Sequence, residues 1–349
     1  MSFLEKMQKY TGVSVRFEWL DQFRGLCMLI LIIQTVGAYL INEIGFPVFA
    51  PHLNHGVLYA EILGWPPLIT LIDAGKHIFI FLVGFMAAFT VDKLMKKGKK
   101  AGVVWFRIIR RLIAVLAINL IAFSVGDTLA ARDILLDSTL AYIAWVGFIV
   151  AVISYFIKKA DLRFFLGLIP FVVQFIIDFF LDLDSMWMNL MGLVGIGLIA
   201  SAFAGWMLKV DGTVDESSFK KRVLPVTIGS LVVMFVTGFF QWANHDYSTV
   251  AMCAIGIGIS GLALFLFYHM EKREFNIPIL SPLGKNLLIV ILLEMVLVRM
   301  LYMDLFLIDF IQVHLAYPMY HFLYAGIVPI FILWGFAKVL AELKLYLRV

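Results

Sequence analysis

Charged residues and cysteines are both scarce in this chain. Only 15% of its 349 residues are charged, whereas 62% are hydrophobic, against about 45–50% apolar residues in a soluble domain. Many apolar runs reach the roughly 18 residues that can cross a bilayer. The two cysteines, Cys27 and Cys253, lie inside such runs; we interpret them as packing residues rather than as a disulfide or metal site. The composition predicts an all-α, polytopic integral membrane protein.

Apolar runs predict about ten transmembrane helices. Threading them alternately across the bilayer places 25 of the 28 lysines and arginines at one set of ends. Cytoplasmic loops carry such an excess, so we predict that both termini are cytoplasmic. The predicted spans are 24–43, 68–91, 107–126, 134–157, 162–181, 187–208, 223–242, 249–270, 283–303 and 318–340.

Outside the spans the chain offers no soluble domain. Residues 1–20 alternate charged and apolar positions, which predicts an amphipathic segment on the membrane surface. We interpret residues 1–349 as a single transmembrane domain. We expect it to lie in the plasma membrane, in contact with the lipid bilayer. The net charge of +4 comes from the cytoplasmic loops and does not indicate nucleic-acid binding.

Five ionisable residues of the predicted spans could meet in one cavity open to the outside. Asp73, Lys76 and His77 are spaced i, i+3 and i+4, so they share one helix face. Glu294 and Arg299 lie in the ninth span. Intramembrane charges mark a polar cavity or a partner, so these residues could bind a polar substrate, the carboxylates and His77 as acid–base groups and the cations as anion holders. The alternative is a set of ion pairs that only packs helices.

Other polar and small residues within spans have simpler interpretations. Interhelical hydrogen bonds and close helix packing account for them. The seven histidines include no obvious pair at matched depth, so haem is not expected, and no metal motif is present. The polar residues are Asn119, Gln174, Asp178 and Asn189, and the glycines are Gly192, Gly195, Gly197, Gly256, Gly258 and Gly261.

Four short motifs occur in an order that suggests a family. Residues 20–26 read L-D-Q-F-R-G-L, and Asp73 opens the pattern D-x-x-x-H-x-F-x-F-x-x-G. The paired Arg110 and Arg111 lead into the third span, and Gly284-Lys285-Asn286 opens the ninth. The chain thereby resembles, over most of its length, the heparan-α-glucosaminide N-acetyltransferase family and its bacterial relatives.

The resemblance implies a membrane acyltransferase active in glycan modification. Such enzymes take an acyl group from cytoplasmic acetyl-CoA or another acyl-CoA and deliver it to a glycan or lipid-linked acceptor outside. It further implies that a histidine acts as base or carries the acyl group, and that Asn286 lies near the thioester. The residues implied to bind the CoA phosphates are Arg24, Arg110, Arg111 and Lys285.

The chain departs from the family where the chemistry is expected. The asparagine near the outer end of the first span is replaced by Gln34-Thr35, and His77 stands where the second pattern has proline. The family has a histidine followed by a Trp-Asn-Gly element shortly before the aspartate that corresponds to Asp73. In this chain only Gly64-Trp65 resembles that element. Some relatives have a histidine in a late span, and Glu294 occupies that position in this chain.

Two interpretations of these departures stay open. Either His52 or His55, from an enlarged outer loop, reaches back over the cavity and completes the catalytic set with Asp73 and His77. Otherwise the chain keeps the fold without the transfer reaction, as a membrane subunit of a larger complex or as a binding or transport protein.

Overall fold

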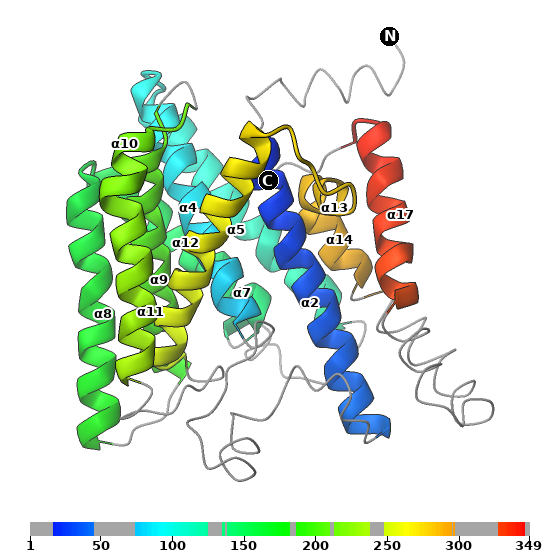
Figure 1. Ribbon diagram of the computed structural model, residues 1–349, viewed down its shortest axis with the longest axis horizontal. Helices are drawn as coiled ribbons and strands as arrows, with labels where there is room; N and C mark the ends of the chain where they lie inside the picture. The colour runs from blue at the N-terminus through cyan, green and yellow to red at the C-terminus, as the bar shows by residue number, and fades with distance from the viewer. Residues whose placement is uncertain are drawn as a thin grey trace. The chain divides into compact units, whose positions relative to one another are not determined.

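Helices account for nearly all of the chain that the structure describes (Figure 1). The structure is a computed structural model, and an isolated antiparallel bridge, Leu208 to Val214, is its sole β feature among the described residues. By internal contacts the chain divides into two compact units, built from distant segments. The described residues are 17–44, 74–124, 135–136, 138–181, 186–209, 213–237, 248–294, 296 and 327–345.

A described helix lies at each of the ten predicted spans. Among these, α4, α7, α8, α9 and α12 are long and apolar enough to cross a bilayer, so the chain is an α-helical membrane protein. The helices are α2 (Glu18–Ile44), α4 (Gly75–Lys96), α5 (Ala101–Ser124), α7 (Thr139–Phe156), α8 (Ala160–Leu181), α9 (Met186–Met207), α10 (Glu216–Ser218), the π-helix η3 (Phe219–Val223), α11 (Leu224–Thr237), α12 (Val250–Lys272), α13 (Leu280–Lys285), α14 (Leu287–Leu293) and α17 (Val328–Glu342).

Unit 2 consists of Leu53–Leu120 and Leu129–Ala263, together with Val349. Its centre is α9, which packs against both α4 and α8, while α4 also packs against α7. At the crossing of α4 and α9 the backbones touch, because a Cβ on Gly84 would lie 2.5 Å from the Cα of Gly197. The rings of Phe81 and Phe203 meet edge to face, 5.4 Å apart. The prediction that Gly197 serves close packing is confirmed.

One face of α8 is apolar and exposed. Its five large exposed side chains recur at helical spacing, so they form a single stripe along the helix. A stripe of this kind is unfavourable in water and suits contact with lipid acyl chains. The stripe consists of Leu162, Phe165, Ile169, Val172 and Ile176.

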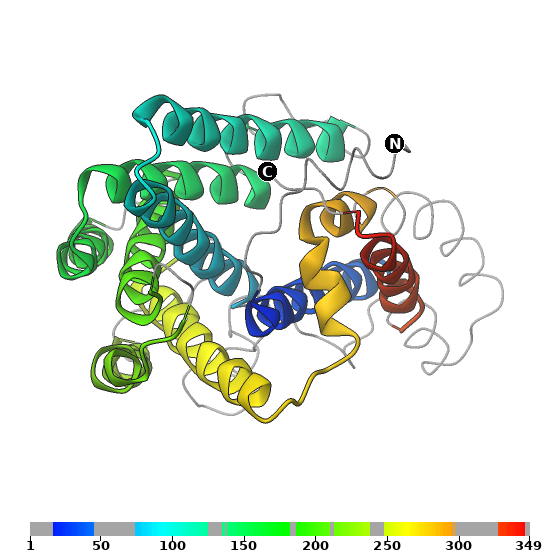
Figure 2. The same cartoon turned by 90° about the horizontal axis from the view of Figure 1, so that it is seen from above.

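Unit 1 consists of Met1–His52, Ile121–Thr128 and Leu264–Arg348. Within it, α2 packs against α13, and α13 packs against α17. The ninth predicted span is not one continuous helix, since α13 ends at Lys285 and α14 begins at Leu287. Figure 2 shows the two pieces, in orange, pointing in different directions. Asn286 lies between them with φ −117° and ψ 26°, outside the helical region.

Candidate functional site

Two of the motifs noted in the sequence meet in unit 1. Gly25 of α2 lies against Leu280, since a Cβ on Gly25 would lie 2.8 Å from the Cα of Leu280. Gly284 of α13 lies against α2 in return, and its Cβ would lie 2.8 Å from the amide nitrogen of Gly25. Both positions need glycine because the opposing atoms are backbone, which cannot move aside. We name this contact between 20–26 and 280–286 the motif junction.

Further residues of the first motif hold the segment that leads into α13. Gln22 is fully buried; its Nε2 donates to Oδ1 of Asn276 at 2.6 Å, and its Oε1 accepts from the amide of Ile277 at 2.9 Å. Phe23 stacks on Phe267 at 6.1 Å between ring centroids. The motif therefore fixes the approach of residues 276–284 to α2.

The cations of the motif junction have carboxylate partners. Nη1 of Arg24 lies 2.8 Å from Oδ1 of Asp21, and Nζ of Lys285 lies 3.0 Å from Oε2 of Glu18. Asp21 and Arg24 are spaced i, i+3, so this ion pair forms within one turn of α2. Because each cation faces one carboxylate, the four side chains carry no net charge. Binding of CoA phosphates by Arg24 and Lys285 requires these ion pairs to open.

Asn286 is a buried polar side chain of the motif junction with one atom unsatisfied in the described part of the chain. It is 2% exposed, and its Nδ2 donates to the carbonyl oxygen of Ala337 in α17 at 3.2 Å. Its Oδ1 has no hydrogen-bond partner among the described residues. A buried amide oxygen without a donor costs about 1–3 kcal/mol, so this atom can accept a hydrogen bond from a ligand.

A second polar cluster lies at the N-terminal ends of α4, α9 and α12, within unit 2. His77 is fully buried, and its Nε2 lies 3.0 Å from Oγ of Ser248. The Ser248 hydroxyl donates to Oδ1 of Asn189. Nε2 of Gln174 donates to the Ser248 carbonyl at 2.8 Å. The predicted interhelical roles of Gln174 and Asn189 are confirmed; the side chain of Asp178 lies outside the described residues.

These contacts determine which way the protons point. Nζ of Lys76 lies 3.5 Å from Oδ1 of Asn189, and an ammonium requires an acceptor, which fixes the amide with its oxygen inward. With Ser248 donating its one proton to that oxygen, the tautomer of His77 that completes the chain of hydrogen bonds carries its proton on Nε2 and donates to Ser248. In this state His77 does not deprotonate the Ser248 hydroxyl, and the pair is not an activated nucleophile.

The backbone of α12 closes over His77. A Cβ on Gly256 would lie 2.5 Å from the Cβ of His77, so the base of the His77 side chain lies directly against that helix. Lys76 is half-buried, with its Nζ 5.8 Å from the centre of the Tyr142 ring. The structure thus places the two predicted site residues in a packed interior among helix ends.

The remaining predicted site residues are distributed as follows. Glu294 is buried in unit 1. Arg110 is exposed, whereas Arg111 lines a small apolar cavity of about 40 Å³ between α4, α5 and α7. Asn119 accepts from the Ser138 hydroxyl at 2.9 Å, which confirms its interhelical role. His52, His55, Asp73 and Arg299 lie outside the described residues.

Several polar residues of these clusters were not singled out from the sequence. Gln22 lies within the first motif but was given no role there, and Ser248 lies in a predicted outer loop. Arg163 counted only as one of the flanking cations, yet the structure buries it. The one available signal was Asp92, an acidic residue just before a run of lysines.

The fold and these clusters define an α-helical membrane protein with buried polar residues. Comparison of the sequence with models of known families and with curated proteins gives no match.

Proposed function

We propose that the chain is a membrane-bound acyltransferase. It takes an acyl group from cytoplasmic acyl-CoA and transfers it to a glycan or lipid-linked acceptor on the outer face. The observation that carries this proposal is the motif junction: two motifs more than 250 residues apart in the sequence meet through Gly25 and Gly284. Both motifs belong to the set by which the sequence resembles the heparan-α-glucosaminide N-acetyltransferase family.

The motif junction offers suitable groups for an acyl-CoA. Oδ1 of Asn286 can accept from an amide N–H, such as those of the pantetheine arm. Arg24 and Lys285 are part-exposed, at 25% and 23%, so they can exchange their carboxylate partners for phosphates. Phosphate binds such cations through charge-assisted hydrogen bonds.

The direct test is transfer of labelled acetyl from acetyl-CoA. Membrane vesicles holding the chain are supplied with radiolabelled acetyl-CoA, and label is followed in the extracted glycan and lipid fractions. We expect transfer by the wild type, and about a 100-fold loss of kcat in Asn286→Ala if the side chain orients the thioester. Transfer equal to that of empty vesicles, by wild-type protein that unfolds cooperatively, would contradict the proposal.

A second candidate function rests on the His77 cluster. Nε2 of His77 lies 3.0 Å from Oγ of Ser248, and Gly256 lies against the Cβ of His77, so this buried histidine is held by its neighbours and is not presented to a substrate. This arrangement favours a relative without transferase activity that serves as a membrane subunit or as a binding or transport protein. This second candidate is distinguished from the acyltransferase by binding of acyl-CoA or acceptor without any transfer of label.

A further inference from the structure

A buried arginine joins three helices at the opposite end of unit 2 from His77. Arg163, in the first turn of α8, is 1% exposed. Its Nη2 donates to Oδ2 of Asp92 in α4 at 2.8 Å, and its Nη1 donates to Oγ of Ser154 in α7 at 3.0 Å. A Cβ on Gly205 of α9 would lie 2.7 Å from Nη2, so the guanidinium occupies space that this glycine leaves.

The guanidinium is not fully satisfied by these partners. Its Nε is buried without a hydrogen-bond partner among the described residues. A buried charged donor left unsatisfied is costly. Among the described residues, Asp92 is the one carboxylate lining this region, and Arg163 already engages it. An additional anion beside Arg163 is therefore favourable.

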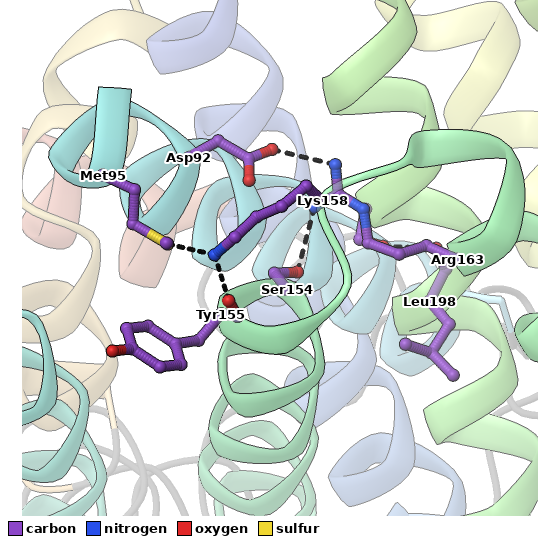
Figure 3. A network of polar contacts seen from close by, with 8 residues as sticks. Asp92, Met95, Ser154, Tyr155, Lys158, Arg163 and Leu198 are labelled. Carbon is purple, nitrogen blue, oxygen red and sulfur yellow. Dashed lines mark hydrogen bonds and ion pairs between the residues drawn. The ribbon is translucent and has the colours of Figure 1, made fainter. Parts of the chain in front are cut away.

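Lys158, in the turn between α7 and α8, adds a second cation. Figure 3 shows its Nζ directed toward Met95 and toward the main chain of Tyr155. Nζ lies 2.7 Å from the Met95 sulfur and donates to the Tyr155 carbonyl oxygen. A thioether is a weak acceptor, so an anion would be a better partner for this ammonium.

These groups line a cavity of about 350 Å³, a volume within the range of small-molecule sites. Five cations and one carboxylate face it, and the rest of its lining is apolar. We name it the basic cavity. Its charged residues are Asp92, Lys93, Lys96, Lys158, Arg163 and Lys209, and its uncharged residues are Phe89, Met95, Ala160, Ala204, Gly205 and Leu208.

Lysines near a cytoplasmic end of a helix are common without any ligand, because of the positive-inside rule. Lys99 and Lys100 are of that kind, since they are exposed and do not line the cavity. The basic cavity differs because its cations gather around one hollow together with the buried Arg163. Basic pockets between helices on the cytoplasmic side suit phosphate head groups.

We propose that the basic cavity binds the phosphate group of an anionic ligand, either a phospholipid head group or the phosphates of a soluble molecule such as coenzyme A. The cations would surround the phosphate, while Phe89, Met95 and Leu208 would contact its apolar part. This proposal is independent of acyl transfer, because all of its residues lie in unit 2 and the motif junction lies in unit 1.

The test uses two double variants with equal change in net charge. Lys158→Gln with Lys209→Gln neutralises two lysines that line the cavity, and Lys99→Gln with Lys100→Gln neutralises two lysines that do not. Purified protein in detergent is titrated calorimetrically with short-chain phosphatidylglycerol, short-chain phosphatidylcholine and coenzyme A. Thermal unfolding without ligand checks that each variant is folded.

We expect a phosphate ligand to bind the wild type and the Lys99→Gln, Lys100→Gln variant equally. The Lys158→Gln, Lys209→Gln variant should bind it about tenfold more weakly, equivalent to about 1.4 kcal/mol. Phosphatidylglycerol binding without competition by coenzyme A identifies a lipid head group. Coenzyme A binding without competition by phosphatidylglycerol identifies a soluble phosphate. Equal weakening of both variants, equal affinity for phosphatidylcholine and phosphatidylglycerol, or no binding of either phosphate ligand would overturn the proposal.

Discussion

Gly25 of α2 and Gly284 of α13 lie so close that a Cβ on Gly284 would be 2.8 Å from the amide nitrogen of Gly25. Real Cβ atoms do not approach backbone nitrogen so closely, and neither helix can shift without losing the bonds that Gln22 makes to Asn276 and Ile277. The contact therefore depends on glycine at both positions.

Replacing Gly284 with alanine should destabilise unit 1. Overpacking of a close contact costs about 1–3 kcal/mol, and here the opposing atoms are rigid backbone. A matched control is Gly335→Ala in α17, where nothing lies within 4 Å of the added Cβ. The thermal unfolding midpoint in detergent should fall for Gly284→Ala and stay the same or rise for Gly335→Ala. Equal midpoints for the two variants would contradict the contact.

Asp92→Asn should be more destabilising than the double change Asp92→Asn with Arg163→Met. The single change leaves a buried guanidinium without its carboxylate, at a cost of about 3–5 kcal/mol, whereas the double change removes the charge as well. Asp92 is 17% exposed, which places the cost toward the lower end of that range.

The control for this pair is Arg222 with Asp161, which are 50% and 58% exposed. Their coupling should be about 0–1 kcal/mol because solvent screens them. Both couplings are measured by double-mutant cycles on the free energy of unfolding. Similar couplings for the two pairs would show that burial does not strengthen the contact between Arg163 and Asp92.

The fold was predictable from the sequence to the level of its helices, because a described helix lies at each predicted apolar run. The break at Asn286 was not predictable. Its cause is tertiary: the asparagine donates to Ala337, and Gly284 lies against α2. Local helix propensity carries no information about partners so distant in the sequence.

The clusters were predictable only in part. The i, i+3, i+4 spacing grouped Lys76 with His77, but a spacing identifies a face without identifying the helix that covers it. His77 is covered by Ser248, just before α12, and by Gly256 within α12. The sequence predicted Arg163 only as one of the cations that flank the spans. It can be buried because it pairs with Asp92, 71 residues earlier in the chain.

His77→Gln should separate a hydrogen-bonding role from an acid–base role. Glutamine keeps an N–H donor near the position of Nε2, so it can still donate to Ser248, whereas alanine cannot. We expect His77→Gln to unfold within a few degrees of the wild type and His77→Ala to unfold at clearly lower temperature. Acyl transfer that survives in His77→Gln would exclude His77 as the proton acceptor; its loss with normal stability would support the acid–base role.

Phosphate binding in the basic cavity should weaken at alkaline pH. Burial lowers the pKa of Lys158; Asp92 raises it and Arg163 lowers it, but the net direction is down. An adjacent phosphate favours the protonated lysine, so binding raises the pKa of Lys158. Above the lowered pKa of the free protein, binding must therefore take up a proton, and the affinity falls as pH rises.

The measurement is the affinity for the phosphate ligand at neutral and at alkaline pH. The wild type should lose affinity over this interval, and Lys158→Gln should lose less, since it lacks the titrating ammonium. Parallel pH profiles for the two proteins would show that Lys158 does not contact the phosphate.

The most direct test of the central claim is binding of acetyl-CoA to the purified protein in detergent, followed by thermal shift and calorimetry. The variants are Arg24→Gln with Lys285→Gln in the motif junction, and Lys158→Gln with Lys209→Gln in the basic cavity. We expect acetyl-CoA to bind more tightly than its 3′-dephospho form, and the motif-junction variant to lose affinity. Absence of binding, or binding that only the basic-cavity variant weakens, would contradict an acyl-CoA site at the motif junction.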